Sequence, residues 1–198
     1  MSRLVVLVAD SNMKAAVEGL LTRSESLRIR CGDYQVHPHP GHDPGVWNDA
    51  VEFLRVVAQP DDHVLVVLDR EGSGHEDQSA DQMENTLQAS LVRAGRGGRS
   101  GAVVIDPELE IWVWSDSPHV GQILGMDGQA FQRVLATEMM PNGKPARPRE
   151  LMESILRRTR VPRSSSLYGK LARTVGIGRC TDRAFLRLRD FLQQWFPA

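Results

Sequence analysis

The chain has 198 residues, a formal net charge of −1 and 41% hydrophobic residues, a composition that can bury one core and favours a single domain with an appendage. It has no apolar run near the length of a membrane span and no signal-peptide pattern, so we expect no membrane interaction. The two cysteines, Cys31 and Cys180, form neither a disulfide framework nor a metal-type spacing, and we therefore expect a cytoplasmic protein.

The small net charge hides an asymmetry along the chain. Residues 141–198 contain 13 Lys or Arg against 4 Asp or Glu, whereas the first 140 residues contain 11 basic and 21 acidic groups. An acidic part that could hold metal, joined to a basic tail, is typical of a metal-dependent enzyme that acts on a polyanion. The alternative is that the arginines, which are good helix formers, simply solvate helix faces.

Three short apolar runs, at 3–9, 64–68 and 102–105, predict strands of a buried sheet. A further strand, second in chain order, is expected somewhere within 27–36. Apolar residues at the helical period predict helices between them, beginning near Met13, Trp47 and Ala80. Because strands alternate with helices, we expect an α/β fold whose mostly parallel, four-stranded sheet is flanked by helices.

Three segments between these elements carry turn-forming residues. The stretch His37-Pro38-His39-Pro40-Gly41-His42-Asp43-Pro44-Gly45 predicts a flexible surface loop, and its histidines lack the spacing of metal ligands. The glycine-rich segment 95–101 matches neither the P-loop nor the dinucleotide fingerprint and predicts a mobile linker. Pro107 is expected to open a helix after the fourth strand.

The last third of the chain is helical in pattern. Helices are predicted within 149–158, after the serines at 164–166 and from Thr181 onward. Each has one apolar stripe, so none is expected to be stable alone. We therefore expect an α/β core of residues 1–140 and a basic helical subdomain of residues 141–198 packed on it.

Acidic residues follow three of the predicted strands, namely Asp10, Asp69 with Glu71, and Glu110. The carboxyl ends of parallel strands meet at one edge of a sheet, where ligands bind, so we expect these residues to lie together. Carboxylates so close raise one another's pKa and call for a cation or a basic partner. Asp10, Asp69, Glu71 and Glu110 are therefore candidate catalytic and metal-binding residues, with Mg²⁺ or Mn²⁺ activating water for phosphodiester cleavage.

This arrangement resembles the Toprim fold, which topoisomerases, primases and the nucleases of the overcoming-lysogenisation-defect class share. Toprim proteins carry an acidic residue after the first strand, usually Glu followed by Gly, and an Asp-x-Asp pair after the third. Here Asp10-Ser11 and Asp69-Arg70-Glu71 stand at those places. Asp10 reaches one methylene less far than Glu, and Glu71 changes the ligand geometry, although both residues keep the charge.

The chain is more closely similar to a Toprim-like family often encoded near restriction and phage-defence genes. The hallmarks of that family are an acid-x-acid turn, a Glu-x-Trp element, a Lys-Pro pair and a helical tail. This sequence supplies Glu110-Ile111-Trp112, Lys144-Pro145 and Leu167-Tyr168-Gly169-Lys170-Leu171-Ala172, followed by Arg179-Cys180-Thr181-Asp182-Arg183-Ala184-Phe185. The resemblance implies a Toprim-like core, with nucleic acid and other defence-system proteins as partners.

The leading hypothesis is a Mg²⁺-dependent nuclease or phosphoryl-transfer protein of a phage-defence system, with phosphates meeting Lys144, Arg147, Arg157, Arg158 and Lys170. An alternative is a non-catalytic Toprim-like subunit that binds partner proteins or nucleic acid in a multi-gene defence complex, since the first motif is degenerate. A third possibility, aspartyl-phosphate chemistry of the receiver type, rests on the apolar strand that ends at Asp69. Receivers, however, require an acidic pair after the first strand, where Ser11 follows Asp10.

Overall fold

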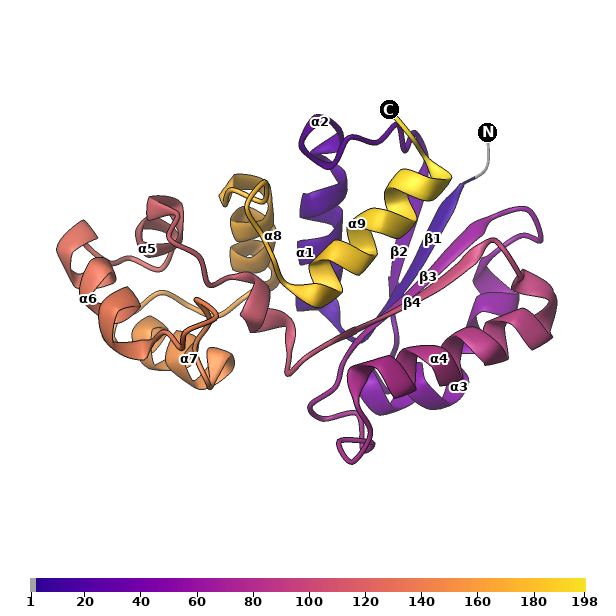
Figure 1. The fold of residues 1–198 in the computed structure, drawn as a ribbon, viewed down its shortest axis with the longest axis horizontal. Coiled ribbons are helices and arrows are strands. Elements are labelled where there is room, and N and C mark those ends of the chain that lie inside the picture. The colour runs from indigo at the N-terminus through magenta and orange to yellow at the C-terminus, as the bar shows by residue number, and fades with distance from the viewer. Residues whose placement is uncertain (1–2) are drawn as a thin grey trace.

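The computed structural model describes residues 3–198, which form one parallel sheet of four strands in the order β2-β1-β3-β4 (Figure 1). The strands are β1 (Leu4–Val8), β2 (Tyr34–Pro38), β3 (His63–Asp69) and β4 (Ser100–Ile105). β1 and β4 are buried along their whole length, as continuous apolar runs predict. The expected α/β fold with a parallel, four-stranded sheet is confirmed.

Helices cover both faces of the sheet. α3 (His42–Val57) and α4 (Ala80–Leu91) pack on one face, and α1 (Ser11–Leu21) and α9 (Arg183–Trp195) pack on the other (Figure 1). The short helix α2 (Ser24–Leu27) follows α1. The core therefore lies in two layers, one on each side of the sheet.

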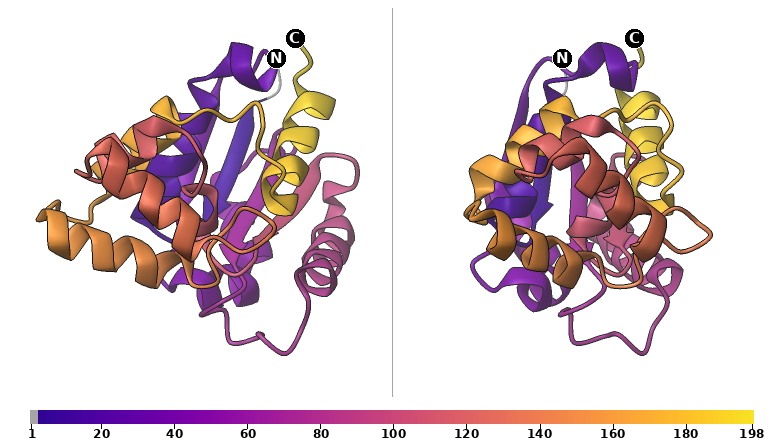
Figure 2. Two further views of the ribbon diagram at one scale, coloured as in Figure 1. Left: turned by 60° about the vertical axis from the view of Figure 1, so that its left-hand side comes forward. Right: turned by 90° about the vertical axis from the view of Figure 1, so that its left-hand side faces the viewer.

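The remaining helices extend the molecule at one end. α5 (Pro118–Ile123), α6 (Gly128–Glu138) and α7 (Pro148–Thr159) gather there, as Figure 2 shows. α8 (Ser165–Thr174) instead packs along α1. α8 and α9, which both belong to the segment 141–198, thus form a layer together with α1 on one face of the sheet. The expected division into a core of residues 1–140 and a subdomain of residues 141–198 stays a prediction.

α1 and α8 approach each other at a pair of glycines. A Cβ atom on Gly19 would lie 2.9 Å from the carbonyl oxygen of Gly169 and 2.8 Å from the Cβ of Ala172. Such distances leave no room for a side chain, so glycine at position 19 lets the two helix backbones come together. This contact fixes α8, and with it Tyr168, against the core.

The outer edge of β4 is closed by side chains instead of another strand. Glu84 of α4 accepts a hydrogen bond from the Val104 N–H at 2.9 Å, and Arg183 of α9 donates to the Val104 carbonyl at 3.0 Å. Arg187 donates to the Ala102 carbonyl at 2.9 Å. The Glu84 carboxylate, 1% exposed, also pairs with Arg183 at 2.8 Å and Arg187 at 3.0 Å. These contacts satisfy backbone groups that an open strand edge would expose.

The segment 37–45, which the sequence predicts to be a flexible loop, is mostly regular. β2 continues through Pro38, and α3 begins at His42. β2 is an edge strand, where proline is tolerated, and Pro44 lies in the first turn of α3, where backbone N–H groups have no partner within the helix. The prolines are therefore compatible with both elements.

Two further expectations, a helix that begins at Pro107 and a linker at 95–101, differ from the structure. Pro107 does not open an α-helix, because the chain forms only the short 3-10 helix η2 (Leu109–Trp112) after it. The predicted linker 95–101 overlaps the π-helix η1 (Val92–Arg96), and Ser100 and Gly101 belong to β4. In the described part of the chain, no helix combines the length and the hydrophobicity that a membrane crossing requires.

The buried Glu84 cluster makes a prediction about stability. We expect Glu84→Ala to lower the free energy of unfolding by about 1–3 kcal/mol, because the buried Val104 N–H loses its acceptor and two partly exposed arginines lose their partner. Denaturant unfolding monitored by circular dichroism measures the change. Glu52→Ala, which removes an exposed pair with Arg55, serves as the control and should change stability by less than about 1 kcal/mol. Equal effects of the two substitutions would contradict the role of the cluster.

Candidate functional site

The carboxyl edge of the sheet gathers acidic residues from all four strand ends. Asp10 follows β1, Asp43 follows β2, Asp69 ends β3, and Glu108 and Glu110 follow β4. Because the strands are parallel, these positions come out on the same side of the sheet, as the sequence predicts for Asp10, Asp69 and Glu110. The sequence interpretation missed Asp43 and Glu108, although each lies within five residues of a strand end.

Asp10 has a structural task at this edge. It is the N-cap of α1, and its Oδ1 accepts a hydrogen bond from the Met13 N–H at 2.8 Å. Beside it lies a surface hollow of about 510 Å³ that His39 and His42 also line. Asp10 is therefore partly committed to the helix, and solvent reaches it through this hollow.

Asp43 and Asp69 lie in contact at the edge, and the pKa of each is raised. The backbone N–H of Asp69 donates to Oδ1 of Asp43 at 2.8 Å, and the Asp69 side chain is 8% exposed. Burial, then the charges of Asp43 and Glu110, hold the pKa of Asp69 well above its ordinary value. Burial also raises the pKa of Asp43, and the charge of Asp10 adds to the effect. Among the described residues, Oδ1 of Asp69 is buried without a hydrogen-bond partner.

Arg149, from the first turn of α7, lies among the other carboxylates. Its Nε is 2.9 Å from Oε2 of Glu108 and 3.8 Å from Oε2 of Glu110, and one of its terminal nitrogens is 3.9 Å from Oδ2 of Asp69. Its backbone N–H also donates to Oε1 of Glu108 at 3.0 Å. Burial raises the pKa of Glu108 although Arg149 opposes that shift. A protein cation thus occupies the side of the edge that faces α7.

Glu110 is held by two groups that the sequence interpretation did not assign to the site. Its Oε1 accepts hydrogen bonds from the Tyr168 hydroxyl and, at 2.8 Å, from Arg163. Arg163 also donates to the Tyr168 oxygen at 2.8 Å. The Glu110 side chain is 2% exposed, and burial followed by the Glu110 charge raises the pKa of Tyr168. Glu110 is therefore a buried ion-pair partner through Oε1, while its Oε2 has no hydrogen-bond partner among the described residues, and its role as a metal ligand stays a prediction.

The predicted pair of Asp69 and Glu71 is divided. Asp69 is buried, whereas Glu71 is exposed beyond the end of β3. The backbone N–H of Glu71 donates to the Pro107 carbonyl at 2.9 Å, which places the two loops side by side. The charge of Glu71 contributes to the raised pKa of Glu108. The two carboxylates thus face different environments, and a shared role in holding a metal stays a prediction.

The five predicted phosphate-binding residues differ in their surroundings. Lys144 donates to the backbone carbonyls of Ile111 at 2.9 Å and Trp114 at 2.7 Å, so it holds the segment after η2 in place. Arg147 pairs with Glu150 at 3.1 Å on the surface. The other three, Arg157, Arg158 and Lys170, are exposed on α7 and α8, and their role with phosphates stays a prediction.

The basic tail supplies counter-ions for the acidic part of the chain. Arg149, Arg163, Arg179, Arg183 and Arg187 each pair with carboxylates that lie in the first 140 residues. Part of the positive charge of residues 141–198 is therefore paired with carboxylates of the same chain, and only the remaining basic side chains are available to bind a polyanion. Among these, Arg157, Arg158 and Lys170 lie at the surface.

Within residues 3–198, no three His, Cys, Asp or Glu side chains are arranged to hold a metal ion. Mg²⁺ does not require such a cage, because it is commonly bound by one or two carboxylates together with waters and substrate phosphates. The buried Oδ1 of Asp69, without a partner and beside Asp43, fits that mode of binding. The donors are oxygens, as a hard cation prefers.

The chain matches no protein-family model, no curated protein and no solved structure. The resemblance to Toprim-like proteins therefore stays a prediction that depends on short motifs. What the protein does must be inferred from the geometry of this edge.

The raised pKa of Asp69 predicts how stability depends on pH. The folded chain keeps a proton that the unfolded chain releases above the ordinary carboxyl pKa of about 4. The free energy of unfolding of the wild type should therefore fall as the pH rises from about 4 toward the raised value. We expect Asp69→Asn to remove this decline and to be more stable than the wild type at neutral pH.

Urea unfolding between pH 4 and 8, with a chelator present, measures both curves. Asp61→Asn is the matched control, because Asp61 is exposed, with a side chain that is 91% accessible. Its curve should run parallel to that of the wild type. A parallel curve for Asp69→Asn as well would show that Asp69 ionises normally in the folded state.

Proposed function

We propose that the protein is a Mg²⁺- or Mn²⁺-dependent nuclease, or a related phosphoryl-transfer enzyme, that acts on nucleic acid. Asp43 and Asp69 hold the cation, with Asp10 beside them. The Toprim-like motifs support a role in phage defence, where other defence-system proteins are candidate partners.

One observation carries this proposal. Asp69 is buried beside a second carboxylate, has an oxygen without a partner among the described residues, and lies 3.9 Å from the nearest arginine nitrogen. Mutual repulsion and burial make this pair unfavourable when both groups are ionised, and a bound cation would offset that cost. The pair lies at the edge of the parallel sheet where ligands of α/β proteins bind.

Each group at the edge has a role that follows from its contacts. A bound Mg²⁺ would supply an activated water and stabilise the charge on the leaving oxygen. Arg149, which is 40% exposed, has a guanidinium that can turn from Glu108 toward a substrate phosphate. Arg163 and Tyr168 keep Glu110 neutralised, so the charge of Glu110 does not repel that phosphate. The exposed Arg157, Arg158 and Lys170 extend a basic surface for the nucleic-acid backbone.

A second function has its own support. Arg149 and Arg163 already neutralise Glu108 and Glu110, as expected of a site that has lost its metal chemistry. In that case the protein is a non-catalytic subunit that binds nucleic acid or partner proteins in a defence complex.

The cleavage reaction tests the first function. We expect purified protein to cleave plasmid or single-stranded DNA or RNA with Mg²⁺ or Mn²⁺ but not with a chelator, and Asp69→Asn and Asp43→Asn to lower the rate by about 100-fold or more. Asp61→Asn, at the opposite edge of the sheet, is the control and should cleave normally. Mg²⁺ at 100 times its dissociation constant should also stabilise the wild type by about 2.7 kcal/mol, but not Asp69→Asn.

Absence of cleavage by the wild type, or equal cleavage by Asp69→Asn, would rule out the enzyme. A stable complex with proteins of the same locus that survives Asp69→Asn would then favour the non-catalytic subunit. Robust turnover without such a complex would exclude that second function.

The exposed arginines of α7 predict the salt dependence of nucleic-acid binding. We expect the double variant Arg157→Glu/Arg158→Glu to weaken binding and to reduce the slope of log affinity against log salt by about 0.9 for each phosphate that the variant no longer neutralises. Fluorescence anisotropy with a labelled oligonucleotide between 50 and 200 mM salt, roughly the range where such effects are large, measures this. Arg93→Glu, which changes an exposed arginine after α4, is the control and should bind as the wild type does. Unchanged slopes in the double variant would remove α7 from the interface.

A further inference from the structure

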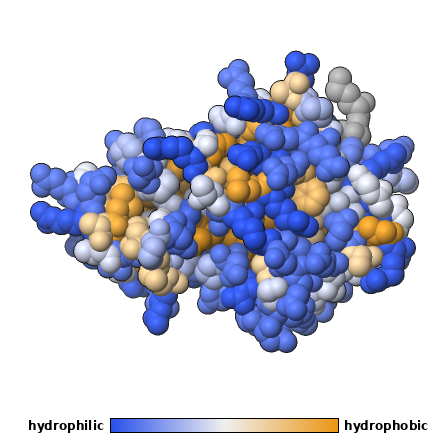
Figure 3. Space-filling view, viewed as in Figure 1, coloured by the Kyte–Doolittle hydropathy of each residue, from blue (hydrophilic) through white to orange (hydrophobic). Residues whose placement is uncertain are grey.

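A cavity of about 690 Å³ lies between α8 and α9, beside the carboxyl edge. Its walls come from η2 and the segment after it, from residues 142–144, and from the connection 174–181 between α8 and α9. Figure 3 shows apolar side chains in the region between α8 and α9, with hydrophilic residues around them. This volume falls within the range of small-molecule sites, about 300–1,000 Å³.

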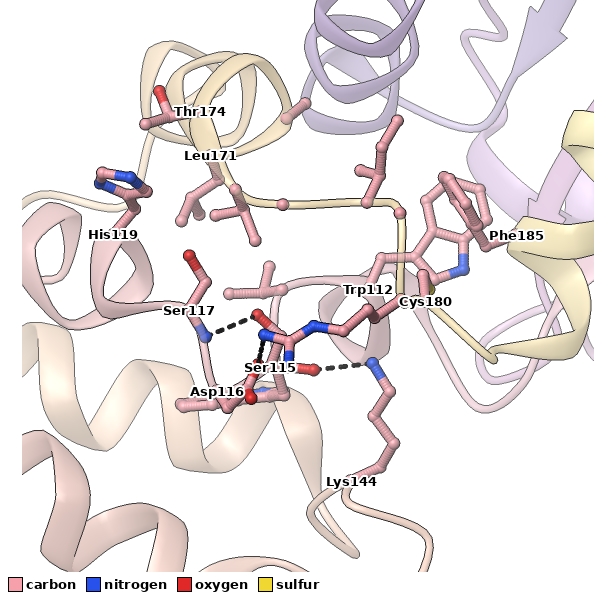
Figure 4. Close-up of a pocket in the computed structure, with 18 of the residues that line it drawn as sticks. Trp112, Ser115, Asp116, Ser117, His119, Lys144, Leu171, Thr174, Cys180 and Phe185 are labelled. Carbon is pink, nitrogen blue, oxygen red and sulfur yellow. Dashed lines mark hydrogen bonds and ion pairs between the residues drawn. The ribbon is translucent and has the colours of Figure 1, made fainter. Parts of the chain in front are cut away.

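One wall is a rigid aromatic surface. The indole of Trp112 donates to Oδ1 of Asp182 at 2.8 Å, and its ring meets Phe185 edge to face at a centroid distance of 5.9 Å. Trp112 and Phe185 lie together on one side of the pocket in Figure 4. Because contacts on two sides fix the indole, it offers a planar ligand a surface that costs little entropy to use.

The polar groups of the cavity favour an anion. The ionised side chains in its lining are Lys144, Arg179 and Asp116, so cations outnumber carboxylates. The Lys144 ammonium donates two of its three N–H groups to the backbone carbonyls of Ile111 and Trp114, and Figure 4 draws one such bond. The third N–H group is left for a ligand. Arg179 pairs with Asp116 at 3.2 Å, but its side chain is 86% exposed, and an ion pair in water holds it only weakly. Both cations can therefore reach a ligand.

We propose that this cavity binds a nucleotide, with the base against Trp112 and the phosphate between Lys144 and Arg179. A planar aromatic group carrying a negative charge is the chemistry that matches one aromatic wall and two cations. The nucleotide is either free or the terminal residue of a nucleic-acid strand.

The cavity is independent of the carboxyl edge but adjacent to it. Tyr168 lines the cavity, while its hydroxyl donates to Glu110 at the edge. η2 likewise has Glu110 on the edge and Trp112 in the cavity. Binding of the nucleotide requires neither a metal ion nor cleavage, so the proposal goes beyond the nuclease function.

The two cysteines provide the test. Cys180 lines the cavity, whereas Cys31 does not, and both thiols are half-buried with a pKa raised chiefly by burial. Alkylation with iodoacetamide at pH 8.5 in a chelator, followed by mass spectrometry of the two peptides, reads both in one sample. We expect millimolar AMP, or a short 5′-phosphorylated oligonucleotide, to slow labelling of Cys180 by about tenfold and to leave Cys31 unchanged. Adenosine and inorganic phosphate alone should protect less.

Variants separate this site from its surroundings. Arg179→Gln should weaken AMP protection by about tenfold, the effect of losing one charge-assisted hydrogen bond. Arg173→Gln, which changes an exposed arginine of α8 outside the cavity, is the matched control and should behave as the wild type does. Protection by the oligonucleotide but not by AMP would assign the site to a strand end, and the reverse would assign it to a free nucleotide.

Other results would overturn the proposal. These are equal labelling with and without both ligands, or equal slowing of Cys31 and Cys180. If Cys180 does not react in the free protein, calorimetric titration and thermal unfolding with AMP and with the oligonucleotide replace the labelling experiment. The site is rejected if neither ligand gives binding heat or shifts the melting temperature. Asp69→Asn should keep full protection of Cys180 by the ligand. If the wild type cleaves nucleic acid but shows no protection of Cys180, the cavity proposal alone is rejected. If it shows protection but no cleavage, the nuclease proposal alone is rejected.

Discussion

Buried carboxylates from the first 140 residues are neutralised by arginines from the last third of the chain, and the position of the C-terminal helices depends on these pairs. Glu108 and Glu110 meet Arg149 and Arg163, while Glu84 meets arginines of α9. A buried charge that loses its partner is strongly destabilising, so the helices that carry the arginines cannot move away at low cost. The asymmetric distribution of charge along the sequence thus contributes to how the C-terminal helices pack on the rest of the chain.

The carboxylates at the carboxyl edge differ in how fully they are paired with basic or hydrogen-bonding groups, and this difference determines which of them can bind a proton or a cation. Oε1 of Glu110 is paired with both Tyr168 and Arg163. Oδ1 of Asp69, in contrast, is buried without a hydrogen-bond partner in the described chain, beside Asp43 and with the nearest Arg149 nitrogen 3.9 Å from its other oxygen. One end of the edge is therefore neutral and ordered, and the other is poised to gain a proton or a cation. In the proposed nuclease function, a substrate phosphate would approach along the neutral end, where Arg149 is partly exposed.

η2 links this edge with the neighbouring cavity. Within its four residues, Glu110 contributes to the edge and Trp112 to the cavity wall, and Lys144 anchors the segment through the Ile111 and Trp114 carbonyls. The contact between Gly19 and α8 then fixes Tyr168, which touches both regions. A ligand in the cavity would therefore contact the same tyrosine that orders Glu110.

The sequence by itself determined three strands and the meeting of Asp10, Asp69 and Glu110 at one edge, because a buried parallel strand is a local apolar run and the residue after it must emerge at the carboxyl end. The second strand was expected within 27–36, but β2 covers Tyr34–Pro38 and only Val36 in it is buried, so no apolar run marks it. The sequence did not reveal that Asp43 belongs to the edge, since the prolines around it indicate a loop until β2 is known to be an edge strand. Only the tertiary structure decided that Arg163 lies on Glu110, 53 positions earlier in the chain, and Arg149 on Glu108, 41 positions earlier. Such pairs are set by how helices pack, and the identity of a charged residue in a helical stripe does not say which distant carboxylate it will meet.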